Sequence, residues 1–415
     1  MNRMLKTIIL FGIFSAAAFL ALLRSFGAGT ARKAGHPQED ERRSNAKRYA
    51  LTIAVFLIAA TCGGFLLVAA GLVPIKASSG HWPITSALLN FAMRRSVILH
   101  SIGIKTPPLN DSALVLKGAG HYEIGCSPCH GSPVLRQPVI AQRMTPHPPD
   151  LAKEVAKWDA EELFYIVKHG VKFTGMPAWP AQERDDEVWA MVAFLRALPQ
   201  LDADKYRQLI HDDITANQLD VAVARFSETA DVPRLVTDNC SRCHGRDGLG
   251  RDSHAFPKLA GQNPNYFYLT MQAYAHGQRN SGIMEPIAAA LRAEVIRELA
   301  RYYADRRPPA PSTRLAQNTA AIERGKQIAE QGIPSQRVPI CVECHGPGPD
   351  RKNPNYPELA GQYAEYLILQ LTLFKKQQRG GTTYAHLMRR VAHGLTEQQM
   401  RDVASYYESL SHGEG

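Results

Sequence analysis

The chain has 415 residues, of which 45% are hydrophobic and 21% are charged. At about 100–200 residues per domain this length predicts two to four domains, and the composition excludes a disordered or low-complexity chain. The net charge of +10 is uneven: residues 1–76 hold 10 basic and 3 acidic residues, whereas residues 77–415 hold 38 basic and 35 acidic residues. No domain-sized part is strongly basic, so the charge argues against nucleic acid as a partner.

Two uncharged apolar runs lie within the first 76 residues. The run at residues 49–75 would form roughly 40 Å of helix, which is long enough to cross a bilayer. The run at residues 7–23 would be roughly 25 Å long, and it could be a second span, the core of a signal peptide, or sequence upstream of the true start. We therefore predict a membrane anchor over residues 1–76, built as one transmembrane helix or a helical hairpin.

The basic residues between these two runs predict the orientation of the anchor. Seven Lys and Arg residues lie between positions 24 and 48, and the positive-inside rule places them in the cytoplasm. The chain after Lys76 would then lie outside. Residues 77–109 combine apolar residues with Arg94 and Arg95, and they could form an amphipathic helix on the outer membrane surface or a packed helix before the first soluble domain.

Six of the seven cysteines fall in three C-x-x-C-H patterns, and a glycine follows each pattern. Zinc sites and thioredoxin-like sites also use C-x-x-C, but neither needs histidine in the next position. With 15 histidines in the chain, three chance matches have a probability on the order of 5 × 10⁻⁵, so we predict c-type haem attachment. Two intervening residues place the sulfurs about one helical turn apart, where they can meet the two vinyl groups of one porphyrin.

The predicted cofactors are therefore three covalently bound haem c groups. Each would be attached through two thioethers, and the adjacent histidine would be the proximal ligand of the iron. The predicted attachment residues are Cys126, Cys129, Cys240, Cys243, Cys341 and Cys344, and the predicted proximal ligands are His130, His244 and His345. Haem attachment requires delivery outside the cytoplasm, which agrees with the orientation predicted from charge.

The sequence around the second motif repeats about 100 residues later around the third. FPKLAGQNPNYFYLTMQAYAHGQR, from Phe256, matches YPELAGQYAEYLILQLTLFKKQQR, from Tyr356, and the first motif has a looser version that contains GMPAWP from Gly175. Apolar spacing near 3.6 predicts helices at the end of each unit. We place soluble domains at residues 110–200, 221–307 and 315–412, with linkers at residues 201–217 and 308–312.

A methionine loop before the last helix of each domain predicts the sixth iron ligand. Met176, Met284 and Met388 follow their haem histidines by 46, 40 and 43 residues. A thioether is a soft ligand that favours Fe(II) and raises the potential. Met144 in the first domain and His386 in the third are rival candidates.

The repeat also separates ligand candidates from core residues. Met271 aligns with a leucine and Met400 with an isoleucine, so we assign both to the core. A proline precedes each candidate methionine by 27, 27 and 31 residues, at Pro149, Pro257 and Pro357. These prolines could offer a carbonyl to the second ring nitrogen of the proximal histidine, or they could simply form a turn.

These features resemble a known family. Each soluble unit resembles a class I cytochrome c domain, and residues 221–412 resemble the di-haem cytochromes of the c4 type through C-x-x-C-H-G, P-x-LAGQ, the methionine loop and a helix ending in YY. The first unit, with GMPAWP, resembles the mono-haem domains of membrane-bound bacterial cytochrome c subunits. The resemblance implies an all-α fold, iron ligated by His and Met, and periplasmic electron transfer. The third unit has Gly325 in its first helix, and the second has no clear counterpart.

We therefore expect a membrane-anchored three-haem electron carrier of the respiratory chain, in the bacterial inner membrane with its haem domains facing the periplasm. Its expected partners are membrane lipid, a donor (a quinol-oxidising complex or a periplasmic dehydrogenase) and an acceptor (an oxidase or a soluble cytochrome). One alternative is a cytochrome c subunit of a larger dehydrogenase or oxidase. A haem peroxidase is less favoured, because it needs an open iron position and no catalytic acid or base stands out.

Overall fold

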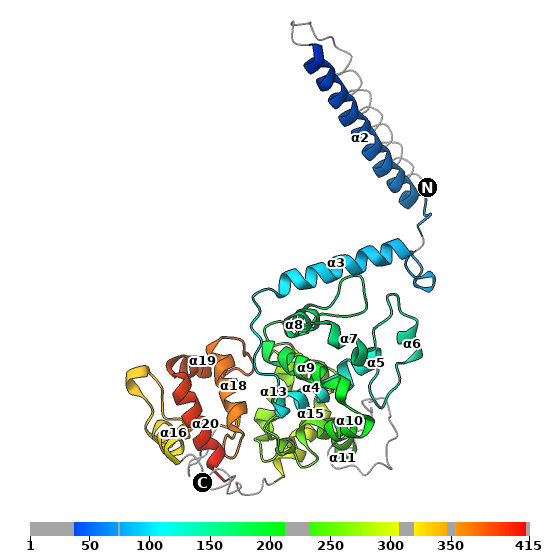
Figure 1. Cartoon of the computed structure of the whole chain (residues 1–415). Helices are drawn as coiled ribbons and strands as arrows, with labels where there is room; N and C mark the ends of the chain where they lie inside the picture. Colours follow the sequence, from blue (N-terminus) through cyan, green and yellow to red (C-terminus); the bar gives the residue numbers. More distant parts are fainter. Residues whose placement is uncertain (1–36, 74, 212–231, 307–318, 347–352, 412–415) are drawn as a thin grey trace, which may run out of the picture. The chain divides into compact units, whose positions relative to one another are not determined.

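A computed structural model of the chain describes residues 37–73, 75–211, 232–306, 319–346 and 353–411 (Figure 1). Every regular element in these residues is a helix, and strand-like pairing is limited to one bridge between Ile333 and Val338. The predicted all-α fold is therefore confirmed. The chain divides into two compact units, residues 1–80 and residues 81–415. The predicted apolar run at residues 7–23 lies outside the described residues.

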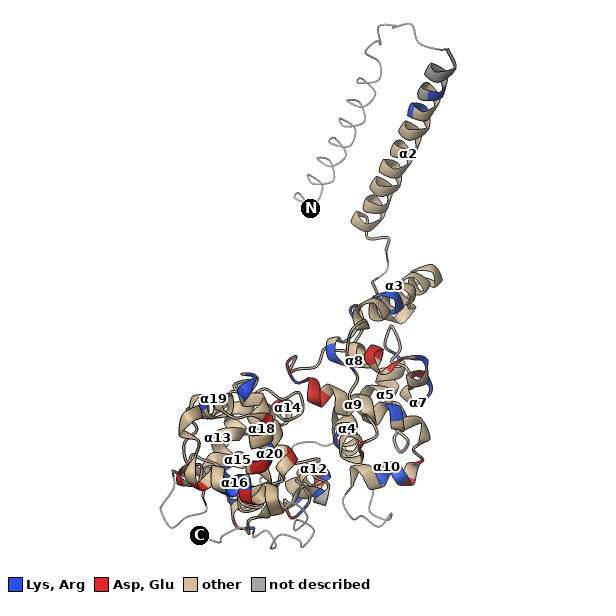
Figure 2. Cartoon of the chain, turned by 60° about the vertical axis from the view of Figure 1, so that its left-hand side comes forward, with Lys and Arg blue, Asp and Glu red and all other residues tan. Residues whose placement is uncertain are grey.

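The first compact unit contains the long helix α2 (Pro37–Ala69), followed by the short 3-10 helix η1 (Ala77–Ser79). Residues coloured as Lys or Arg lie near the start of α2, and no charged residue follows Arg48 along the helix (Figure 2). Ser44–Ala69 is the one described stretch that is long and apolar enough to cross a membrane, judged by length and composition. The helix ends six residues before the apolar run does, and Gly71 just beyond it has a φ of 71°, a conformation that favours glycine.

The second compact unit begins with α3 (Pro83–Ser101) and continues with three groups of helices, each built around one C-x-x-C-H motif. The first group comprises α4 (Ser112–Gly125), α5 (Ser127–His130), α6 (Val139–Gln142), α7 (Leu151–Glu154), η2 (Val155–Lys157), α8 (Ala160–His169), α9 (Asp185–Ala197), η3 (Leu198–Gln200) and α10 (Ala203–Ile210). The second comprises α11 (Val232–Leu235), the π-helical turn η4 (Val236–Cys240), α12 (Ser241–His244), η5 (Gly250–Asp252), α13 (Pro264–Ala275), α14 (Met284–Ala289) and α15 (Ala293–Ala304). The third comprises α16 (Thr319–Gln331), η7 (Pro334–Gln336), α17 (Val342–His345), α18 (Ala364–Lys375), α19 (Ala385–Gly394) and α20 (Glu397–Ser409).

Each group has its own hydrophobic core. The last long helices α15 and α20 bury residues three or four positions apart, as the sequence pattern predicts, whereas α9 is buried on nearly all sides. In α15, for example, the buried residues include Val295, Leu299 and Tyr303. Met271 and Met400 are buried in the second and third cores, so their assignment as core residues is confirmed.

In the first and third groups, the first helix crosses the last long helix at a glycine. A Cβ added at Gly118 in α4 would lie 2.3 Å from the carbonyl oxygen of Ala190 in α9, and one added at Gly325 in α16 would lie 2.0 Å from the carbonyl oxygen of Asp402 in α20. Such contacts are too short for any side chain, so glycine is what lets the two backbones meet. Arg324 reinforces the second crossing with two hydrogen bonds to the Asp402 carboxylate, at 2.9 and 2.8 Å.

The predicted linker at residues 201–217 is wrong in its described part, because Ala203–Ile210 forms α10. Asp202 caps this helix by accepting a hydrogen bond from the backbone N–H of Lys205 at 2.8 Å. Tyr206 and Ile210 are buried in the first core. The polar composition that suggested a linker belongs to the exposed face of a short amphipathic helix.

Gly325→Ala tests the close helix crossing in the third group. The added methyl group must push α16 away from α20, so we expect a loss of about 1–3 kcal/mol in the free energy of unfolding. Thermal unfolding of the haem-loaded protein, followed by circular dichroism, measures this loss. Lys326→Ala, at an exposed neighbouring position on the same helix, is the control and should change stability by less than about 0.5 kcal/mol. Equal melting curves for the two variants would contradict the crossing.

Candidate haem-attachment sites

The three C-x-x-C-H motifs share one local structure. The first cysteine of each motif begins or precedes a single helical turn that ends on the histidine, in α5, α12 and α17. The following glycines, Gly131, Gly245 and Gly346, have φ values of 71°, 76° and 75°. This left-handed conformation ends the turn directly after the histidine, which explains why glycine follows each motif.

The histidine of each motif is held by the proline that the sequence singled out. Nδ1 of His130 lies 2.9 Å from the carbonyl oxygen of Pro149, and the matching distances are 3.1 Å for His244 to Pro257 and 3.0 Å for His345 to Pro357. A ring that donates from Nδ1 carries its lone pair on Nε2, the nitrogen then suited to bind a metal. The carbonyl role of the prolines, which the sequence left open beside a plain turn, is the arrangement found at all three sites.

Burial keeps two of these rings in the neutral form that metals require. It lowers the pKa of His130 and of His244, and the proline carbonyls oppose the shift only in part. Burial also raises the pKa of the Cys126 and Cys240 thiols to about 12 and that of Cys341 to about 11. None of the six motif cysteines forms a disulfide, so all six sulfur atoms are available for thioether bonds.

The three candidate methionines lie in different local structures. Met176 is in a loop, where its backbone N–H donates to Thr174 Oγ1 at 3.1 Å and its carbonyl accepts from Val171 N at 3.2 Å. Met284 is the first residue of α14, and Met388 lies within α19. The predicted loop positions of Met284 and Met388 are therefore wrong, although all three side chains are half-buried. Their ligation of iron stays a prediction.

The two rival ligands differ in their surroundings. Met144 lies against the Met176 loop, because a Cβ added at Gly175 would stand 2.2 Å from Met144 Cε. His386 is exposed at the start of α19, with Nδ1 2.9 Å from the carbonyl oxygen of Thr383. Met144 is thus the more serious rival of the two.

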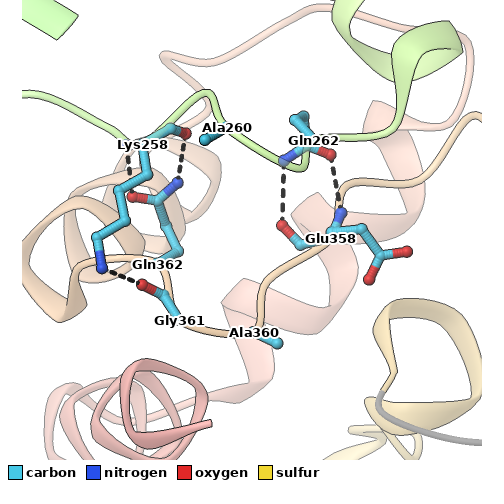
Figure 3. Close-up of a pocket in the computed structure, with 7 residues that line it drawn as sticks. All are labelled: Lys258, Ala260, Gln262, Glu358, Ala360, Gly361 and Gln362. Atoms are coloured by element: carbon cyan, nitrogen blue, oxygen red, sulfur yellow. Dashed lines mark hydrogen bonds between the residues drawn. The ribbon is translucent and has the colours of Figure 1, made fainter. Parts of the chain in front are cut away.

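The second and third groups are joined by a reciprocal pair of glutamines (Figure 3). Gln362 accepts from the backbone N–H of Lys258 at 3.0 Å and donates to its carbonyl at 2.9 Å. Gln262 makes the same two bonds with Glu358, at 2.9 and 3.1 Å. Lys258 and Glu358 directly follow the prolines that hold His244 and His345. The glutamines of the two LAGQ repeats therefore connect the two haem-motif loops.

The second and third groups each also contribute one arginine that contacts the other group. Arg279 donates to Tyr366 Oη and Gln370 Oε1, both at 3.1 Å, and Arg379 donates to Tyr266 Oη at 3.1 Å. Neither guanidinium has a salt bridge to a carboxylate within the described residues, and the buried Nε of Arg379 has no hydrogen-bond partner. Burial raises the pKa of the Tyr266 hydroxyl, but Arg379 and Arg279 outweigh this effect and bring it to about 8.

These two arginines provide a test of whether the site fits haem. Buried cations are stable when an anion neutralises them. Haem propionates are anions that arginine binds in bidentate fashion, so these two guanidinium groups would suit the propionates of a bound haem. The sequence repeat contained both arginines and both glutamines, but their roles depend on contacts between residues about 90 to 115 positions apart.

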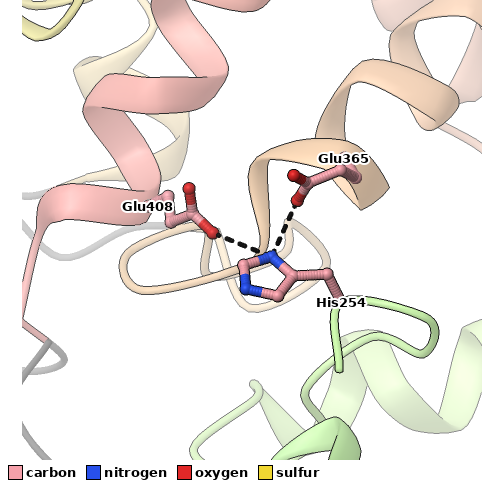
Figure 4. A group of neighbouring side chains, drawn as sticks. All are labelled: His254, Glu365 and Glu408. Atoms are coloured by element: carbon pink, nitrogen blue, oxygen red, sulfur yellow. Dashed lines mark hydrogen bonds and ion pairs between the residues drawn. The ribbon is translucent and has the colours of Figure 1, made fainter. Parts of the chain in front are cut away.

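A third contact between these groups was not predicted at all. Nδ1 of His254 lies 2.8 Å from Glu365 and 3.5 Å from Glu408, which come from α18 and α20 (Figure 4). The His254 ring also packs on Tyr363, with ring centroids 4.4 Å apart. His254 is a lone histidine in the sequence, without a motif to mark it.

Comparison with known proteins agrees with this arrangement. Residues 113–195 match the family described as cytochrome c oxidase, cbb3-type, subunit III, and residues 322–411 match the family described as cytochrome c. These matches contain the first and third motifs.

Individual relatives cover a longer part of the chain. Cytochrome c-552 of Acidithiobacillus ferridurans is 36% identical over 201 residues, which are 48% of this chain and 84% of the relative. The thiosulfate dehydrogenase electron acceptor of Thiomonas intermedia is 33% identical over 168 residues (40% and 76%), and cytochrome c4 of Thiocapsa roseopersicina is 31% identical over 174 residues (41% and 87%). The chain carries covalently bound haem c and transfers electrons. It belongs to the multi-haem c-type cytochromes and contains a segment of the cytochrome c4 type.

Proposed function

We propose that the chain is a membrane-anchored electron carrier with three haem c groups, one for each C-x-x-C-H motif. The observation that carries the proposal is the repetition of one arrangement three times, in which a helical turn ends on a histidine whose Nδ1 lies within 3.1 Å of a proline carbonyl. When bound, haem c supplies reversible one-electron exchange at its iron. The haem domains would be residues 110–200, 221–307 and 315–412, with α10 added to the first.

The proposed iron ligands are the three motif histidines with Met176, Met284 and Met388. Each histidine is kept in one tautomer by its proline carbonyl, so its orientation is set before the metal binds. The cysteine pairs, Cys126 with Cys129, Cys240 with Cys243 and Cys341 with Cys344, would hold the porphyrin by thioether bonds. Two protein ligands on every iron favour an electron carrier over a peroxidase, which needs an open position.

The names of the relatives favour one kind of partner. One relative is named as the electron acceptor of thiosulfate dehydrogenase, and this name means that it receives electrons from a dehydrogenase. We therefore propose a periplasmic dehydrogenase as the electron donor, ahead of a quinol-oxidising complex. The acceptor would be an oxidase or a soluble cytochrome. A second candidate function is a cytochrome subunit of an oxidase or dehydrogenase complex, which the match of residues 113–195 to an oxidase subunit family supports.

We also propose that the chain resides in the bacterial inner membrane, with α2 as a span and the haem groups on the periplasmic side. The basic residues before Tyr49 favour a cytoplasmic location for the N-terminal end of α2. No Asp or Glu occurs between residues 42 and 110, which suits a segment that meets anionic lipid.

Helix α3 has the features of a helix at the membrane surface. Four of its exposed large apolar residues lie three, four or seven positions apart on one face, namely Ile84, Leu88, Phe91 and Ile98, and Ile102 follows directly after the helix. Val97 and Ser101 on another face are buried, and Arg94 lies over the Trp158 ring of the first group. Thirteen residues separate the end of α2 from the start of α3, so lipid is within reach of the apolar face.

Methionine-to-leucine variants test the number of haems and the ligand set. Intact mass should report three haems, and redox titration should resolve three one-electron steps. Leucine keeps the volume but cannot bind iron, so Met176→Leu, Met284→Leu and Met388→Leu should each lower one potential by on the order of 0.1 V. Met271→Leu and Met400→Leu, in the cores, should leave all three potentials unchanged. An intact mass that accounts for only two haems would contradict the proposed three-haem architecture. A potential that does not shift would exclude the substituted methionine as an iron ligand, and Met144 or His386 would then be tested next.

Cysteine labelling in spheroplasts tests the membrane arrangement. In a Cys62→Ala background, Lys153→Cys at an 81% exposed side chain should react fully with a membrane-impermeant thiol reagent from outside. Phe91→Cys, at a position 64% exposed without lipid, should react at least about tenfold more slowly, because burial of a large apolar face contributes several kcal/mol. An unreactive Lys153→Cys would contradict the periplasmic orientation. Equal rates at the two positions would contradict the placement of α3 on lipid.

A further inference from the structure

The loop that precedes α14 in the second group reaches into the first group. Its residue Ile283 packs against the first core. Gly282 lies so close to the Trp179 indole that an added Cβ would stand 2.1 Å from Trp179 Nε1. Trp179 follows Met176 by three residues, and Met284 follows Gly282 by two. The segments that carry two of the proposed iron ligands therefore touch.

The carboxylate of Glu187, at the start of α9, lies between these two segments. Its Oε1 accepts a hydrogen bond from Ser281 Oγ at 2.7 Å. Its Oε2 accepts from the backbone N–H of Gly282 at 2.7 Å and from Trp179 Nε1–H at 3.2 Å. Glu187 is only 3% exposed, so water does not replace these donors.

Arg184 anchors the same junction from the first group. Its Nη1 lies 3.0 Å from Glu187 Oε1 and donates to the carbonyl oxygen of Asn280 at 2.8 Å. A second pair of bonds joins Arg184 to Asp186, at 2.8 and 2.9 Å. Buried charges that are fully hydrogen-bonded resist rearrangement, and the loss of one partner leaves the others unpaired.

Ser281 extends the network to the proposed ligand of the second group. The hydroxyl that donates to Glu187 also accepts from the backbone N–H of Met284 at 3.0 Å and of Ile283 at 3.3 Å. Two consecutive hydrogen bonds therefore lead from Glu187 to the backbone of Met284. On the other side, one hydrogen bond and three residues of chain lead from Glu187 to Met176.

We propose that Glu187 is a positioning residue. It fixes the Met176 loop and the loop that leads into Met284 at the start of α14 in one hydrogen-bonded junction, so that loss of its carboxylate disturbs both methionine sites together. This proposal rests on the proposed function, in which both methionines bind iron. The second and third groups share the separate junction of Gln262 and Gln362, so the Met388 site should not depend on Glu187.

The test compares Glu187→Gln with Glu183→Gln in the full-length holoprotein. The carboxamide of Glu187→Gln replaces one carboxylate oxygen by an NH₂ donor. At Oε2 this donor would face the N–H groups of Trp179 and Gly282, and at Oε1 it would face Arg184 Nη1, so either orientation sets donor against donor. We expect two of the three potentials to fall, namely the two that Met176→Leu and Met284→Leu identify. Carbon monoxide should bind the reduced protein at least about tenfold more tightly at these two sites, since a weaker thioether bond competes less. Glu183→Gln, which loses only an exposed bond of 3.4 Å from Asn280, should change neither property.

Ser281→Ala tests the Met284 side of the junction separately. It also keeps the proposal testable if Glu187→Gln does not fold. It removes one hydroxyl, so the Met284 site should shift and the Met176 site should not. If Glu187→Gln and Ser281→Ala leave every potential unchanged while the methionine variants shift theirs, Glu187 has no positioning role and the proposed ligands stand. If Met176→Leu or Met284→Leu leaves its potential unchanged, the proposed function itself fails at that site.

Discussion

A hydrogen bond between each motif histidine and a proline carbonyl is the constraint on which the rest of each group of helices depends. The proline lies 19, 13 or 12 residues beyond its histidine, so the bond ties the motif turn to the segment that leads into the remaining helices. It also sets the tautomer and direction of the ring. In a small helical domain with a limited core, this bond and the covalent thioethers together define where an iron can be held.

The same proline segments carry the contact between the second and third groups. Lys258 and Glu358, each directly after its proline, present their backbone groups to Gln362 and Gln262. The repeat makes this contact symmetric, since each group supplies one glutamine and one backbone segment. Arg279 and Arg379 are arranged in the same way, because each donates to a tyrosine hydroxyl of the other group. The two histidines are therefore linked through short paths of hydrogen bonds and backbone, and Arg279 and Arg379 place two guanidinium groups between the second and third groups.

Features that depend on neighbouring residues could be predicted from the sequence, and features that depend on distant contacts could not. The motif turns and the helical spacing of α15 follow from local pattern, and the core role of Met400 follows from the repeat. Met388 was placed in a loop before the last helix, whereas the ten residues Ala385–Gly394 form α19. Tyr206 looked like part of a polar linker, and only the first core reveals why α10 folds. Glu187 had no sequence signal for a junction, because Ser281 and Gly282, its partners in the second group, lie nearly 100 residues away.

The two junctions of the second group differ in origin. The contact with the third group uses residues that the repeat contains twice, whereas the contact with the first group uses Glu187 and Trp179. The glutamate at the matching place in the second group, Glu294, is exposed on α15, although both glutamates precede a buried valine. The symmetric junction joins the segments that follow the prolines of the second and third groups, and the asymmetric one joins the segments that carry Met176 and Met284. The second group is thus held by one neighbour through its proline segment and by the other through the loop before α14.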